Sequence, residues 1–121
     1  MKNIYLSDFL SRYGSDISQW HDPAKKDISD YPSYYWVLCP KDSFAFITLC
    51  AYLFVPITRG DIYEIIDDSL YYTGVSWHYS RADNECFTFY LEHSVNKAAE
   101  FIRNYSSKDN MMISFYVAEE I

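Results

Sequence analysis

Glycine is scarce in this chain, with three residues among 121, and no G-x-G-x-x-G or Walker sequence occurs. A backbone cradle for phosphate groups needs several glycines close together, so nucleotide-binding loops of these kinds are excluded. The three histidines and three cysteines show neither C-x-x-C nor H-x-x-x-H spacing, and no H-E-x-x-H sequence is present. The usual patterns of zinc sites are therefore missing, and we expect no metal and no other cofactor.

Long apolar runs and a disulfide pattern are also lacking. The uncharged stretch 44–57 is shorter than the roughly 20 residues that a membrane-spanning helix needs. Residues 1–12 already contain charges of both signs, which is atypical of a secretory signal. Three widely spaced cysteines, an odd number, are typical of reduced thiols. We therefore expect a cytoplasmic protein in which Cys39, Cys50 and Cys86 are core thiols.

Tyrosine and acidic residues are abundant, because the chain has thirteen tyrosines and a net charge of -7. Residues 1–60 carry six basic and six acidic side chains, whereas residues 61–121 carry four basic and eleven acidic ones. The whole negative excess therefore lies in the second half. An acidic surface repels nucleic-acid phosphates and anionic lipids and attracts cationic partners. We expect a basic protein partner, and no direct binding to nucleic acid or to a membrane.

The first half of the chain contains few clear periodic patterns. Residues 7–13 predict a short helix with an apolar stripe, and 34–39 predict a strand. Between them, 15–32 are polar and contain two prolines, so we expect a surface loop with one turn of helix around Trp20. Almost every position of 44–55 is apolar, which fits a buried strand or a buried helix. Its β-branched and aromatic residues favour the strand.

The segment 61–72 predicts an amphipathic helix. At 100° per residue, four apolar side chains share one face and the acidic side chains share the opposite face. Because folding does not require acidic and aromatic groups there, we interpret that face as a surface for binding a partner protein. The residues assigned to it are Asp61, Glu64, Asp67, Asp68, Tyr71 and Tyr72.

The remainder of the second half predicts a hairpin, a helix and a strand. Alternating apolar residues over 75–80 and 86–92 are typical of two paired strands. A second amphipathic pattern covers 94–105, and alternation returns over 113–117. With the helix at 61–72, the C-terminal half is ordered αββαβ.

The length of the chain suits one hydrophobic core, and no linker or repeat divides it. We therefore predict a single globular domain over 1–121. Its class is α+β, with a mixed or antiparallel sheet and two to three helices.

Only one constellation of side chains suggests catalysis. His78, Cys86 and His93 fall on neighbouring predicted strands, so a cysteine nucleophile with a histidine base is a possible arrangement. No sequence around Cys86 matches a cysteine hydrolase, and adjacent carboxylates such as Asp67 and Asp68 point about 100° apart on a helix. We therefore predict a protein without catalytic activity. A small enzyme built around these three residues is an alternative.

In size, acidity and lack of a catalytic motif, the chain resembles the small inhibitors that bacteria and phages direct against basic nucleic-acid enzymes. These include immunity proteins of toxin systems, among them contact-dependent inhibition, and anti-CRISPR proteins. The similarity covers overall character and no shared motif. It implies an immunity protein that blocks a basic active site or nucleic-acid groove of a cognate toxin. An anti-CRISPR or other anti-defence inhibitor is the alternative within the same class.

Overall fold

The computed structural model describes residues 3–17, 32–105 and 110–120. Most of the loop predicted over 15–32, including Trp20, lies outside these ranges. Within them the chain forms three α-helices, five strands and two short 3-10 helices. In chain order these are α1 (Ile4–Tyr13), β1 (Ser15–Asp16), η3 (Ser33–Tyr35), β2 (Trp36–Val37), α2 (Pro40–Tyr52), β3 (Ile57–Ile66), β4 (Ser69–His78), α3 (Phe87–Tyr105), β5 (Met111–Val117) and η4 (Ala118–Glu120).

The strands form two antiparallel sheets. The larger sheet has the order β4-β3-β5, and β1 pairs with β2 in the smaller one. A bridge between Leu38 and Ile113, with two backbone hydrogen bonds of 2.8 Å, links the smaller sheet to the edge of β5. The predicted α+β class with a mixed or antiparallel sheet and two to three helices is confirmed, since the described residues form antiparallel sheets and three α-helices.

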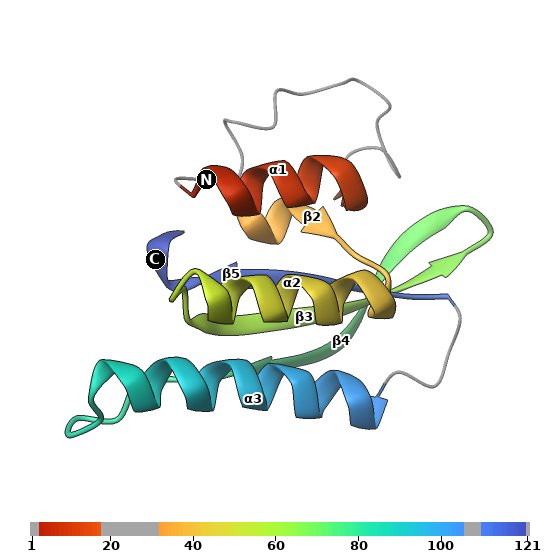
Figure 1. Ribbon diagram of the computed structural model, residues 1–121. Coiled ribbons are helices and arrows are strands. Elements are labelled where there is room, and N and C mark those ends of the chain that lie inside the picture. Colours follow the sequence, from red (N-terminus) through yellow and green to blue (C-terminus); the bar gives the residue numbers. More distant parts are fainter. Residues whose placement is uncertain (1–2, 18–31, 106–109, 121) are drawn as a thin grey trace.

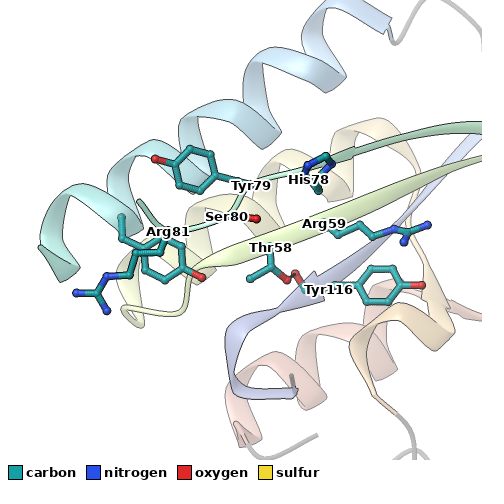
Figure 2. Close-up of a pocket in the computed structure, with 8 residues that line it drawn as sticks. Thr58, Arg59, His78, Tyr79, Ser80, Arg81 and Tyr116 are labelled. Carbon is teal, nitrogen blue, oxygen red and sulfur yellow. Dashed lines mark hydrogen bonds between the residues drawn. The ribbon is translucent and has the colours of Figure 1, made fainter. Parts of the chain in front are cut away.

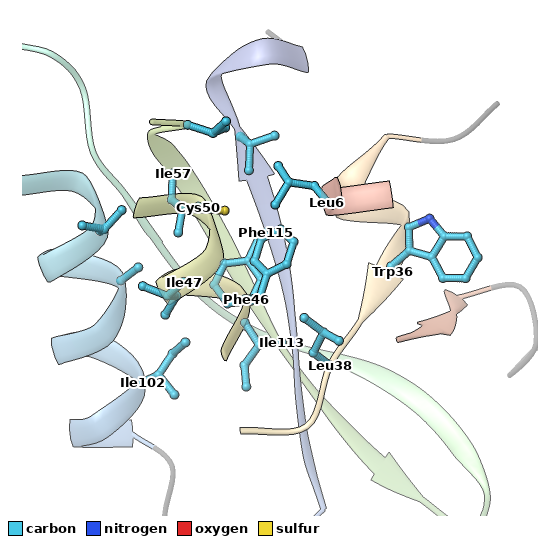
Figure 3. Close-up of a cluster of buried hydrophobic side chains, with 14 of the residues drawn as sticks. Leu6, Trp36, Leu38, Phe46, Ile47, Cys50, Ile57, Ile102, Ile113 and Phe115 are labelled. Atoms are coloured by element: carbon cyan, nitrogen blue, oxygen red, sulfur yellow. The ribbon is translucent and has the colours of Figure 1, made fainter. Parts of the chain in front are cut away.

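Helices α2 and α3 cover one face of the larger sheet, and α1 packs against α2 (Figure 1). The core lies between these layers. Phe46 of α2 stacks on Phe115 of β5 with ring centroids 5.0 Å apart, and Leu6, Ile102 and Ile113 surround the pair (Figure 3). Among the described helices, none has the length and apolarity needed to cross a bilayer.

The strand predicted for 44–55 is wrong, because these residues form most of α2. Pro40 occupies the first turn, where its missing N–H is not needed, and Asp42 adds a favourable acidic charge there. Buried residues recur at Ser43, Phe46, Ile47 and Cys50, which is the spacing of one helix face.

The helix predicted for 61–72 is also wrong, because these residues form the end of the β3–β4 hairpin. Ile66 pairs with Ser69, and only Asp67 and Asp68 lie between the strands. The isoleucine spacing that suggested a helix is coincidental, since Ile62 is buried whereas Ile66 is exposed. β-Branched and aromatic residues in both strands favour the extended structure.

The hairpin predicted from 75–80 and 86–92 is wrong, although most of its first strand is present. Residues 75–78 belong to β4, but 87–92 form the first turns of α3, which continues through the predicted helix 94–105. Leu91 lies on the same buried face as Val95, Ala98 and Ile102. The alternation of Phe87 and Phe89 therefore did not reflect a strand, since both are exposed.

The predicted order αββαβ is observed as α2-β3-β4-α3-β5, although different residues form its first three elements. The strand predicted for 113–117 lies within β5, and the helix predicted for 7–13 lies within α1. The strand predicted for 34–39 is much shorter, because 33–35 form η3. Cys50 is a core thiol as predicted, whereas Cys86 is exposed and Cys39 is half-buried.

Candidate functional site

The β3–β4 hairpin extends past the ends of α2 and α3, so its turn stands away from the body of the protein (Figure 1). Its two turn residues have φ angles of 50° at Asp67 and 62° at Asp68. A two-residue loop with positive φ at both positions is a type I′ turn, which matches the twist of a hairpin. Asparagine and glycine fit these positions best, so the turn carries two carboxylates where neutral residues would be more stable.

Three further residues of the predicted contact group lie beside this turn. Glu64 pairs with Tyr71 and Tyr63 pairs with Tyr72, so each pair shares one face of the hairpin. Tyr71 is 52% exposed and Tyr72 is 49% exposed. The rings of Tyr63 and Tyr72 are 5.5 Å apart, which holds Tyr72 in place at the surface.

We refer to Glu64, Asp67, Asp68, Tyr71 and Tyr72 as the hairpin tip. No lysine or arginine occurs in the sequence between Arg59 and Arg81, so the tip itself carries three acidic residues and no basic one. Five of the six predicted contact residues are thus brought together, although by a hairpin and not by the face of a helix. Their role in binding stays a prediction.

The sixth predicted residue, Asp61, is separate from the tip because its side chain is buried. Asp61 is 5% exposed, and its Oδ1 atom accepts a hydrogen bond from Nε of Arg59 at 3.0 Å and forms an ion pair with Nη2 at 3.0 Å. The hydrogen bond and the charge of this carboxylate raise the pKa of Arg59. Asp61 therefore holds an arginine in position and is unavailable for direct contact with a partner.

Arg59 and Tyr116 form a second group of functional candidates next to Asp61. The guanidinium of Arg59 lies 5.2 Å from the centroid of the Tyr116 ring, and Tyr34 stacks on the same ring at 4.4 Å. Burial and the nearby charge of Asp61 raise the pKa of Tyr116 to about 12. Sequence reasoning missed Arg59 because the helix was assumed to begin at Asp61, whereas strand geometry places residues i and i+2 on one face.

A third group of polar side chains ties the β4–α3 loop to helix α3. Glu85 Oε2 lies 2.6 Å from the Tyr79 hydroxyl and 2.6 Å from His93 Nδ1, and Glu85 Oε1 accepts from Ala82 N–H at 3.2 Å. The Tyr79 hydrogen bond is the main cause of the lowered pKa of Glu85. The same bond is the main cause of the raised pKa of Tyr79, about 12.

The residues of the alternative catalytic site are not joined into a nucleophile and base. Cys86 immediately precedes α3. In the described part of the chain, no hydrogen bond connects it to His78 or His93. His93 contacts Glu85 and Tyr79 instead. Across residues 3–17, 32–105 and 110–120, no group of three or more His, Cys, Asp or Glu side chains is arranged to hold a metal ion.

Comparison with known proteins identifies a family whose model this chain matches. Residues 23–117 match the model of a protein family described as Immunity protein 40. The match covers more than half of the chain and includes α2, the complete hairpin, α3 and β5. No protein with a curated description matches this chain.

Proposed function

The chain belongs to the Immunity protein 40 family, and we propose on that basis that it is a non-catalytic inhibitor of a cognate bacterial toxin. The toxin is of the kind used in contact-dependent inhibition, and its active site or nucleic-acid groove is basic. The family membership favours this function over the anti-CRISPR alternative.

The observation that carries the proposal is the hairpin tip. Asp67 and Asp68 occupy a turn that projects from the fold, and Glu64 lies on the adjacent strand. Tyr71 and Tyr72 are half exposed beside these charges. Tyrosine gives a large contact area with few torsions to order, and acidic groups steer a cationic partner toward the surface.

Inhibition follows from the shape and charge of the tip. A basic groove that binds phosphates attracts the carboxylates of the tip over a distance of about one Debye length, which is about 8 Å at physiological salt. Once bound, the tip occupies the groove and the exposed tyrosines pack against its walls. Substrate is excluded by occupancy, so no chemical step on the inhibitor is required.

A titration of the toxin with the protein tests this function and its site together. The toxin to use is the one encoded beside the gene of this chain, and its activity is measured at increasing amounts of inhibitor. We expect complete inhibition at a one-to-one ratio. Failure of the wild-type chain to inhibit would contradict the function itself.

The site is tested with Asp67→Lys/Asp68→Lys, which reverses two charges at the tip. Its matched control is Glu92→Lys/Glu100→Lys, which makes the same change in charge at exposed positions on α3. We expect the tip variant to inhibit at least about tenfold less well than the wild type at low salt. The control variant should lose less inhibition than the tip variant does. Equal weakening of both would show that total charge matters and that the tip does not.

A further inference from the structure

This acidic protein has a pocket of about 600 Å³ whose described lining residues are basic, aromatic or hydroxyl-bearing, with no acidic one among them (Figure 2). It lies where the first residues of β3 meet the end of β4 and the loop before α3. Its basic groups are Arg59, His78 and Arg81. We propose that this pocket binds a small ligand through a carboxylate or phosphate group.

Arg81 is the principal anion-binding group in this arrangement. Its Nε donates to the backbone oxygen of Glu85 at 2.9 Å, and its guanidinium lies 5.4 Å from the centroid of the Tyr90 ring. These contacts use the inner nitrogen and one face of the guanidinium. In the described part of the chain, the two terminal nitrogens form no hydrogen bond or ion pair, so they can donate to two oxygens of one anion.

Arg59 lies at the other end of the pocket, where its guanidinium points away from Arg81 (Figure 2) and is partly neutralised by Asp61. Asp61 accepts a hydrogen bond from Nε of Arg59 and forms an ion pair with Nη2, and Tyr116 lies under the guanidinium. The other terminal nitrogen, Nη1, is not used by this carboxylate. Arg59 and Arg81 therefore resemble each other, since each is fixed by one hydrogen-bonding partner and stacks on one tyrosine of the pocket.

The aromatic wall of the pocket is held in place before any ligand binds. Tyr79 donates to Glu85 at 2.6 Å, and the rings of Tyr79 and Tyr90 stack with centroids 6.1 Å apart. Glu85 thus orients Arg81 through its backbone oxygen and Tyr79 through its carboxylate. Binding to such a preorganised site loses little side-chain entropy, which favours the bound state.

Two further features define the class of ligand. His78 adds ring nitrogens to the lining, and Ser80 adds a hydroxyl. The volume lies within the roughly 300–1,000 Å³ that small-molecule sites occupy. A small organic anion, such as a polycarboxylate or a phosphate monoester, has matching size and chemistry. The long-range charge of the protein opposes anions, so affinity must come from these close contacts.

Nuclear magnetic resonance of the isolated chain tests the site without any toxin, so its outcome does not depend on the proposed function. Inorganic phosphate and citrate are titrated separately at constant ionic strength, with sodium chloride as the baseline. We expect saturable shifts of the amide signals of residues 58–59, 78–81 and 116. Saturation by phosphate alone, by citrate alone or by both supports the site and identifies the anion. No saturable shift with either probe overturns it.

Variants of Arg81 link the shifts to the guanidinium. Because Arg81 is exposed, Arg81→Ala should keep the fold, and we expect its affinity for the probe to fall about tenfold. Arg81→Lys keeps the charge but loses the paired donor groups of the guanidinium. Its affinity for the probe should therefore lie between those of the wild type and Arg81→Ala. Arg103→Ala removes an exposed arginine from the last turn of α3 and should bind as the wild type does. Equal affinity of Arg81→Ala and the wild type contradicts the proposal.

Discussion

Replacing Asp67 with Asn and Asp68 with Gly should stabilise the fold and slow toxin binding at the same time. Both residues have positive φ, a conformation that is unfavourable for residues with a side chain and is favoured by Asn-Gly in a type I′ turn. We expect a gain of about 1 kcal/mol in the free energy of unfolding, which is a rise of about 4 °C in the unfolding midpoint for a domain of this size.

The effect on binding comes from the loss of two carboxylates at the tip. A carboxylate about 10 Å from one cation in water contributes about 0.4 kcal/mol. With two carboxylates facing two cations, and screening included, the loss is about 1.2 kcal/mol at 10 mM salt and about 0.5 kcal/mol at 150 mM. Association should therefore slow about sevenfold at low salt and about twofold at physiological salt.

Thermal unfolding and stopped-flow association at the two salt concentrations measure these effects. Glu92→Gln/Glu100→Gln is the matched control, because it removes two carboxylates from the exposed side of α3 and leaves the turn intact. The control should slow association less than the turn variant does, and its free energy of unfolding should not rise as that of the turn variant does. A turn variant that is more stable yet associates as fast as the wild type at 10 mM salt would refute the role of the tip.

Three other substitutions test the fold. Gly60→Ala should destabilise the protein by about 2–3 kcal/mol, because a Cβ there overlaps the buried ring of Trp77. A denaturant midpoint close to that of the wild type would contradict this packing. Phe54→Gly should raise the free energy of unfolding by about 1 kcal/mol, since Phe54 has a φ of 59° and is 70% exposed; a loss of stability would reveal contacts of the ring. Glu85→Gln should be less stable at pH 7. The hydrogen bond from Tyr79 lowers the pKa of Glu85 below 4.5, so this contribution is lost as the pH falls through that lowered value. The difference in stability between the two proteins should therefore shrink as the pH falls below 4.5, and a difference that stays the same throughout an acid titration would contradict the assignment.

Helices and strands could be predicted from the sequence where the apolar side chains recur with a single period, either that of a helix or that of a strand. The helix over 94–105 and the strand over 113–117 have a single, clear pattern of burial, and both were found. Residues 44–55 are almost entirely apolar, and the single threonine Thr48 cannot define a period. A helix buried between α3 and β5 could therefore not be distinguished from a strand buried in a sheet.

The hairpin could not be recognised because its signals were ambiguous. The spacing of Ile62, Ile65, Ile66 and Leu70 fits a helix as well as two short strands, and the turn has Asp-Asp where Asn-Gly would mark a hairpin. Residues 57–66 form a strand because β3 pairs with β5, a contact between distant parts of the sequence. The acidic and aromatic composition of the tip was found from the sequence, whereas the burial of Asp61 against Arg59 depends on the strand register.

Amide hydrogen exchange of the free and toxin-bound protein tests most directly whether the hairpin tip is the binding surface. If the tip enters the toxin groove, amides of residues 64–72 gain protection in the complex, while exposed amides on the outer side of α3 exchange as before. Protection on α3 or on β5, with exchange at residues 64–72 unchanged, would contradict the account.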